Sequence, residues 1–233
     1  MRILIVSDIH GNLESLAALP RDYDELWVLG DLVNYGPNPA EVIRFVRANA
    51  SLVVRGNHDD SAGFNADPKC SVRFKALAQA TGELTNSVLT GTEREYLRSL
   101  PTTVERTVEG VRFYACHAVP SDPLFTYCAP DSQAWEDEIQ RIDASVLLAG
   151  HTHLPFVRRI GDRTIVNPGS LGQPKNSQPL ACYALWRDGR FELCSSAYQV
   201  ELTIQKIREM PVAEDIRDDL AKILATGCAP PPR

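Results

Sequence analysis

The sequence lacks the features of a secreted or membrane-bound chain. It has no apolar run long enough to cross a bilayer, and the apolar stretch near its N-terminus is too short for a signal peptide. Its six cysteines are dispersed without a CxxC pair, which favours reduced thiols and leaves a disulfide framework as the weaker alternative. These absences predict a cytoplasmic protein with no membrane partner.

An excess of positive charge is also absent. The chain carries 24 Lys and Arg residues against 30 Asp and Glu, a net charge of -6. This balance argues against a nucleic-acid partner bound through a broad basic surface, and so against a nuclease. A negative surface also repels anionic substrates, so phosphate chemistry here requires positive charge concentrated at one place.

Internal repeats and long low-complexity segments are missing as well. The 233 residues, 44% of them hydrophobic and 23% charged, are typical of a soluble globular fold. We expect one domain over residues 1–226 and a flexible Pro-rich tail over residues 227–233.

Short apolar runs in the first half of the chain alternate with amphipathic stretches. Residues 3–6, 26–29 and 52–54 are expected to be strands, and residues 13–19 and 40–48 helices. This βαβαβ order predicts an α/β domain with right-handed crossovers.

The later segments are predicted to be helical and then rich in strands. Residues 71–100 are expected to be mostly helical, with Thr92 and Glu95 forming the capping box of the helix that ends near residue 100. Hairpins are expected around residues 109–110, 161–162 and 188–189, with a buried strand at 146–148 and a last helix at 213–225. The pattern predicts two stacked sheets with helices outside.

Polar clusters follow six of the apolar strands, where sheet proteins of this kind build their sites. All five histidines of the chain lie in these clusters: His10, His58, His117, His151 and His153. A lone histidine is most simply a packed core or surface residue, but five of five at strand ends favours a common site.

The residue types in these clusters suit metal ions. Seven of them offer carboxylate, amide oxygen or imidazole ligands: Asp8, His10, Asp31, Asn57, His117, His151 and His153. Such a set favours Mn, Fe, Zn, Co or Ni over Ca, and it is too large for one tetrahedral zinc. Two dications sharing one carboxylate would keep a net positive charge beside Asp8 and Asp31, suited to a phosphate and to activating water.

The ordered motifs Asp-x-His, Gly-Asp, Gly-Asn-His-Asp, His and Gly-His-x-His resemble the calcineurin-like metallophosphoesterase superfamily. The turn Asn167-Pro168-Gly169-Ser170 is typical of its small bacterial and archaeal phosphodiesterase branch. The resemblance implies a four-layer αββα sandwich, two mixed sheets flanked by helices. It also implies a phosphodiesterase that hydrolyses a small or nucleotide-like phosphoester through a hydroxide bridging two metals, with Mn²⁺ the expected ion.

The resemblance implies a role for each polar residue. The first metal would take Asp8, His10, Asp31 and His153. The second would take Asp31, Asn57, His117 and His151, so that Asp31 bridges. His58 would be catalytic, either stabilising the transition state or protonating the leaving group.

Two positions depart from the pattern of the protein serine/threonine phosphatases in this superfamily. There the Gly-Asp motif continues to an Asp that orients the catalytic histidine and an Arg that binds phosphate, whereas this chain has Asn34 and Tyr35. Protein phosphatase activity is therefore disfavoured. A dinucleoside polyphosphate hydrolase and a phosphomonoesterase remain alternatives, as does a non-catalytic scaffold, although scaffolds tend to lose the ligand histidines.

Several residues near the motifs allow two interpretations each. Asp59 assists His58 or is a turn residue. The aromatic side chains of residues 119–138, like Tyr35 and Phe64, form a wall for a base or pack locally. Lys175 contacts a substrate anion or, as the sequence favours, is a solvated surface lysine.

Overall fold

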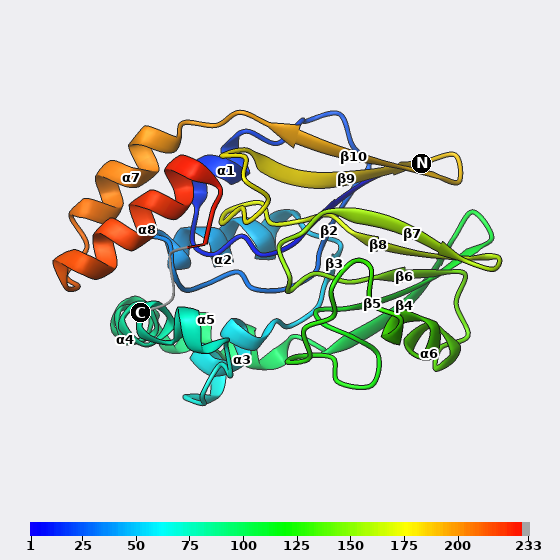
Figure 1. Ribbon diagram of the computed structural model, residues 1–233, viewed down its shortest axis with the longest axis horizontal. Helices are drawn as coiled ribbons and strands as arrows, with labels where there is room; N and C mark the ends of the chain where they lie inside the picture. Colours follow the sequence, from blue (N-terminus) through cyan, green and yellow to red (C-terminus); the bar gives the residue numbers. More distant parts are fainter. Residues whose placement is uncertain (230–233) are drawn as a thin grey trace.

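The computed structural model describes residues 1–229 of the chain. Two five-stranded mixed sheets stack on each other, and helices cover their outer faces (Figure 1). This is the expected αββα sandwich. The last four residues of the predicted Pro-rich tail, 230–233, lie outside the described residues.

The first sheet contains the N-terminal βαβαβ unit. Its strand order is β10-β9-β1-β2-β3. The bounds are β1 Arg2–Val6, β2 Glu25–Val28, β3 Leu52–Val53, β9 Ala181–Arg187 and β10 Arg190–Ser196. Strands β1, β2 and β3 are parallel, whereas β9 pairs with β1 in antiparallel register. The crossovers are α1 (Leu13–Ala17) and α2 (Pro39–Asn49).

The second sheet has the order β4-β5-β6-β8-β7. Its strands are β4 Thr103–Val108, β5 Val111–Cys116, β6 Val146–Leu148, β7 Phe156–Ile160 and β8 Arg163–Asn167. Strands β5, β6 and β8 are parallel, while the predicted hairpins place β4 and β7 at the two edges. Each sheet therefore contributes three parallel strands, and the polar motifs follow their carboxyl ends.

The alternation of side chains along β1 explains why its aliphatic run is uninterrupted. Ile3 and Ile5 pack between the sheets against aromatic residues such as Trp27 and Phe113. Leu4 and Val6 point the other way, into the cluster that β1 shares with α1 and α2. Because both faces of the strand are covered, every position after Arg2 is fully buried.

The remaining helices gather at one end of the sandwich, apart from α6 under the second sheet (Figure 1). They are α3 Asn57–Phe64, a 3-10 turn Val72–Phe74, α4 Lys75–Val88, α5 Gly91–Ser99, α6 Ala134–Gln140, α7 Val200–Arg208 and α8 Glu214–Thr226. The helical character of residues 71–100 and the last helix are as predicted. Helices α3, α6 and α7 were not predicted from the pattern. No helix within residues 1–229 is long and apolar enough to cross a membrane.

The predicted capping box of α5 is wrong by two residues. Thr90, not Thr92, is the N-cap: its hydroxyl accepts from the Glu93 amide at 3.3 Å, and the Glu93 carboxylate accepts from the Thr90 amide at 2.9 Å. Thr90 and Thr92 are each followed by a Glu three residues later, so the spacing alone could not identify the N-cap.

Candidate metal centre

The ligand-type residues lie on tight turns just beyond the carboxyl ends of the parallel strands. Five of them have a positive φ: Asp8 (55°), His10 (48°), Asp31 (56°), His151 (66°) and His153 (62°). This left-handed conformation is unfavourable for residues other than glycine and is typical of functional sites, where packing enforces it. The turns aim all five side chains at one buried place.

Glycine in the Gly-Asn-His-Asp motif permits the close approach of two turns. A methyl group on Gly56 would lie 2.1 Å from the Asp31 Oδ1 and 2.3 Å from the Asp31 amide nitrogen. Asp59, three residues later, accepts hydrogen bonds from the backbone amides of Asp31 (2.8 Å), Leu32 (2.8 Å) and Gly56 (3.0 Å). Asp59 thus fixes the backbone of a ligand-type carboxylate.

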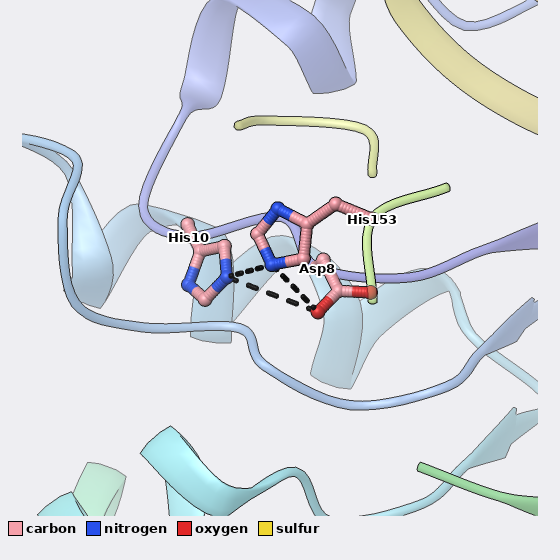
Figure 2. A group of neighbouring side chains, drawn as sticks. All are labelled: Asp8, His10 and His153. Carbon is pink, nitrogen blue, oxygen red and sulfur yellow. Dashed lines mark hydrogen bonds and ion pairs between the residues drawn. The ribbon is translucent and has the colours of Figure 1, made fainter. Parts of the chain in front are cut away.

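A first group of side chains consists of Asp8, His10 and His153 (Figure 2). The two Nε2 atoms are 3.2 Å apart, and Asp8 Oδ1 lies 3.2 Å from that of His153 and 3.8 Å from that of His10. His10 donates its Nδ1–H to the Val33 carbonyl at 3.0 Å, and His153 donates its Nδ1–H to the Gln173 carbonyl at 2.6 Å. Both Nε2 atoms therefore carry lone pairs that face each other.

A second group consists of Asp31, His117 and His151, with Asn57 beside them. His117 Nε2 lies 3.1 Å from His151 Nδ1, 3.1 Å from Asn57 Oδ1 and 3.3 Å from Asp31 Oδ2. The other ring nitrogen of each histidine donates to a backbone carbonyl: His117 Nδ1 to that of residue 29 at 2.7 Å, and His151 Nε2 to that of residue 125 at 3.1 Å. Asp31 Oδ2 is also 3.7 Å from His10 Nε2, so one carboxylate oxygen faces both groups.

These contacts test whether divalent cations fit. Oxygen and nitrogen lone pairs converge in both groups, and Asp8 Oδ1 is buried without a hydrogen-bond donor. The other Asp8 oxygen accepts from the His151 amide at 3.1 Å, which fixes the carboxylate. Buried acceptors facing one another are costly unless a cation lies between them. The donor set therefore fits two divalent ions that share Asp31.

Burial and charge separate the protonation states of the four histidines. Burial lowers the pKa of His10 and His153, and that of His151 to about 3, so these rings are neutral at pH 7. Although burial opposes it, the Asp31 carboxylate raises the pKa of His117 to about 9. In the metal-free protein a proton on His117 thus holds part of the charge that a metal would supply.

His58 lies in the first turn of α3, beside the two groups. Its amide donates to Asp31 Oδ1 at 2.9 Å, and the Asn34 side-chain amide donates to its Nδ1 at 2.8 Å. The ring of Tyr35 makes edge contacts with His58 and His10, with centroids 4.8 Å apart in both cases. Burial lowers the pKa of His58 to about 4, so its ring is neutral and carries its proton on Nε2.

Comparison with known proteins places this site in a family. The model of the calcineurin-like phosphoesterase superfamily domain matches residues 1–187. The chain belongs to the calcineurin-like phosphoesterase superfamily. Members of this superfamily hydrolyse phosphoesters with divalent metals, which agrees with the two groups of ligand-type residues.

Individual relatives span nearly the whole chain or only a quarter of it. An uncharacterized protein of Methanocaldococcus jannaschii is 28% identical, covering 88% of this chain and 91% of its own. A crystal structure of a metallophosphoesterase from Sphaerobacter thermophilus has a TM-score of 0.83 at 29% identity, covering 97% of this chain and 100% of its own. The symmetrical bis(5'-nucleosyl)-tetraphosphatase of Psychromonas ingrahamii is 40% identical over 67 residues, 25% of this chain and 24% of its own.

All seven predicted ligands and His58 of this superfamily member thus lie together. The structure also places further residues beside them, of which Lys175 is one. Lys175, expected as a solvated surface lysine, is half-buried instead. Its ammonium lies 3.4 Å from His153 Nε2 and 4.1 Å from the centroid of the Phe74 ring. Burial lowers the pKa of Lys175 to about 8. Sequence reasoning favoured full solvation because nothing local to residue 175 marks it as buried, and contact with a substrate anion stays a prediction.

The aromatic residues near the site divide between the two interpretations. Tyr127 stacks on His151, with centroids 3.8 Å apart and an interplanar angle of 28°, and 47% of it is exposed. Trp135, a residue of α6, is buried against the second sheet, which is local packing. Phe64 is half exposed, with the Arg55 guanidinium 5.0 Å from its ring centroid. Only Tyr127 offers an open aromatic face directly beside a ligand-type histidine.

Proposed function

We propose that this chain is a two-metal phosphodiesterase acting on a small or nucleotide-like phosphoester. One observation carries the proposal. Seven buried oxygen and nitrogen donors converge as two groups, and one Asp31 oxygen faces both groups. Two-metal hydrolases use such an arrangement to hold both the attacking and the leaving oxygen of a displacement.

The two ions would be held by the residues of the two groups. Asp8, His10 and His153 would bind one, while Asn57, His117 and His151 would bind the other, with Asp31 common to both. Two bound dications, which we expect to be Mn²⁺, would lower the pKa of water and polarise the phosphoryl group.

The chain's own residues prepare the site before any ion enters. A backbone carbonyl accepts the outward-facing N–H of each of the four ligand histidines, which orients the ring and aims its other nitrogen inward. Such orienting contacts typically change metal affinity or activity about 10- to 100-fold.

His58 would act as a hydrogen-bond donor to the phosphoryl or leaving-group oxygen. Its depressed pKa of about 4 leaves no imidazolium proton to transfer at pH 7, and two nearby dications would depress that pKa further. The Asn34 amide occupies Nδ1, so the remaining N–H is on Nε2. Of the two roles implied for His58, the structure thus supports stabilisation of the transition state.

Dinucleoside polyphosphate hydrolysis is the second candidate function. It is favoured by the 40% identity over 67 residues to the symmetrical tetraphosphatase of Psychromonas ingrahamii. Because that match covers a quarter of either chain, it supports the chemistry more than the substrate. The acidic chain and the neutral Asn34 and Tyr35 do not favour phosphoproteins.

The test is a substrate screen with protein reconstituted with Mn²⁺. We expect hydrolysis of an aryl phosphodiester such as bis(p-nitrophenyl) phosphate, with poor activity on a phosphoserine protein. Asp31→Asn, prepared in the same way, is the control and should be inactive. Robust phosphoprotein hydrolysis without diesterase activity would overturn the proposal, and so would diesterase activity that survives Asp31→Asn.

A further inference from the structure

Lys175 carries a positive charge into the metal centre. It lies in the segment after β8, and its ammonium reaches within 3.4 Å of His153 Nε2 in the first group. The ring of Phe74 also contacts the ammonium, which lies 4.1 Å from the ring centroid in a cation–π contact that helps to hold it in place. No ion pair within residues 1–229 joins Lys175 to a carboxylate at 4.0 Å or less.

This position is unfavourable for a lysine once metals are bound. A dication held by Asp8, His10 and His153 would repel an ammonium that contacts one of its own ligands. An anion that contacts both the metal and Lys175 removes the repulsion. The three N–H donors of the ammonium can bind phosphate oxygens as a point charge.

Tyr35 explains why a cation is needed from elsewhere in the chain. Its neutral ring packs on His10 and His58, at the position where the related protein phosphatases have a phosphate-binding Arg. The positive charge therefore comes from Lys175, which reaches the first group from the segment after β8.

The charge count indicates what the site would bind. Two dications would supply four positive charges against the two negative charges of Asp8 and Asp31, and Lys175 would add a fifth once an anion beside it keeps its ammonium protonated. A phosphodiester contributes one negative charge. It therefore leaves a larger surplus of positive charge in the site than an ester that carries a second negative charge nearby.

We propose that Lys175 is an anion-binding residue that contacts a second anionic oxygen on or beside the scissile phosphoryl group. This inference rests on the two-metal hydrolysis proposed above and, among phosphoesters, shifts the favoured substrate away from a plain phosphodiester. The favoured substrates carry additional negative charge at that point. The charge can come from a terminal phosphate monoester or from the neighbouring phosphate of a phosphoanhydride chain.

The experiment compares Lys175→Met, which removes the charge, with Lys175→Arg, which keeps it. Lys222→Met, at an exposed lysine of α8, is the matched control. Each Mn²⁺-loaded protein is assayed for metal content and, by calorimetry, for binding of inorganic phosphate. The values of kcat/KM are measured for bis(p-nitrophenyl) phosphate, p-nitrophenyl phosphate and diadenosine tetraphosphate.

Lys175→Met should keep two metals per chain and bind inorganic phosphate about 10- to 100-fold more weakly, the usual range for a lost hydrogen bond to a charged group. Its kcat/KM should fall by a similar factor for whichever highly charged substrate the site uses, and much less for the monoanionic diester. A selective loss on p-nitrophenyl phosphate identifies a terminal phosphate, and one on the tetraphosphate identifies a phosphoanhydride chain. Lys175→Arg should recover most of the phosphate binding.

Three results would overturn the inference. They are unchanged phosphate binding in Lys175→Met, equal losses on all three substrates, and a change in metal content. The proposed function fails separately, if wild-type protein with two metals hydrolyses none of the three. Phosphate binding would still test Lys175 in that case.

Discussion

Metal binding should displace at least one proton from the site at pH 6. Metal ions require unprotonated histidine ligands. Burial lowers the pKa of His10, His151 and His153 from its usual value, whereas Asp31 holds the pKa of His117 at about 9. His117 must therefore lose a proton when the metal-free protein is loaded.

The size of the effect follows from the distance between pH and pKa. At pH 6, three units below the pKa of His117, the ring is protonated in all but about 0.1% of molecules. We therefore expect at least about one proton released per chain. Metal affinity should rise about tenfold per pH unit up to the pKa, because one proton competes with the metal. Working at pH 6 also stays below the range near 7 in which water on a metal ionises.

The sign of the accompanying stability effect is fixed by the same pKa. The folded-state pKa of His117 is raised above its unfolded value of 6.5. The protonated ring therefore stabilises the metal-free fold fully below pH 6.5, and this contribution is lost as the pH rises through about 9. Metal-free protein should melt at a lower temperature at pH 9 than at pH 6.5.

Calorimetric titration of metal-free protein with Mn²⁺ measures the release. Two buffers with different ionisation enthalpies give the number of protons from the difference in apparent enthalpy. NMR of the histidine rings in the metal-free protein is the independent check, since His117 should titrate near pH 9 while His151 stays neutral down to pH 5. A release near zero, or metal affinity that does not rise with pH, would refute the assignment of the proton to His117.

Three further sets of substitutions test, in turn, the metal ligands, the role of His58 and the packing of the fold. Asp31→Asn should bind fewer than one metal per chain by elemental analysis, because one carboxylate faces both groups; two retained metals would contradict this. His58→Ala should keep both metals and lose about 10²- to 10³-fold in kcat, equally for nitrophenyl and alkyl leaving groups. His151→Ala should lose metal as well as activity. A smaller loss for His58→Ala on the nitrophenyl ester than on the alkyl ester would indicate that His58 is a general acid. Gly172→Ala would place a methyl carbon 1.8 Å from a backbone carbonyl oxygen beside the site and should lower the melting temperature and metal content, while Gly91→Ala, in open space, should change neither.

The strands and the ligand-type residues could be predicted because their physical signals are local. A run such as Ile3–Val6 is aliphatic at every position only because both faces of the strand are covered. The polar residues that follow such runs converge because parallel strands end at the same edge of a sheet. The role of the seven residues as metal ligands stays a prediction, although their lone pairs face one another as it requires.

Helix α3 could not be predicted from hydrophobic periodicity. Its sequence, Asn57 to Phe64, has polar residues at most positions, and the helix buries six of its eight residues against the site rather than one apolar stripe. Its start is fixed by Asp59, which accepts hydrogen bonds from two backbone amides of the turn after β2 and from one at the start of the helix. That signal exists only after the turns have come together.

The residue that we propose to discriminate between substrates, Lys175, could not be singled out from the sequence for a related reason. Metal ligands must lie at the ends of strands to reach the same ion, so their motifs keep a recognisable order along the chain. A phosphate-binding cation needs only to reach the same point in space, and any loop at the edge of the sheets can deliver it. Here Tyr35 has the position of the absent Arg but packs on His10 and His58, while Lys175 reaches the first group from the segment after β8. The chemistry of such a site is therefore readable from its motifs, whereas its substrate depends on long side chains whose loops the motifs do not contain.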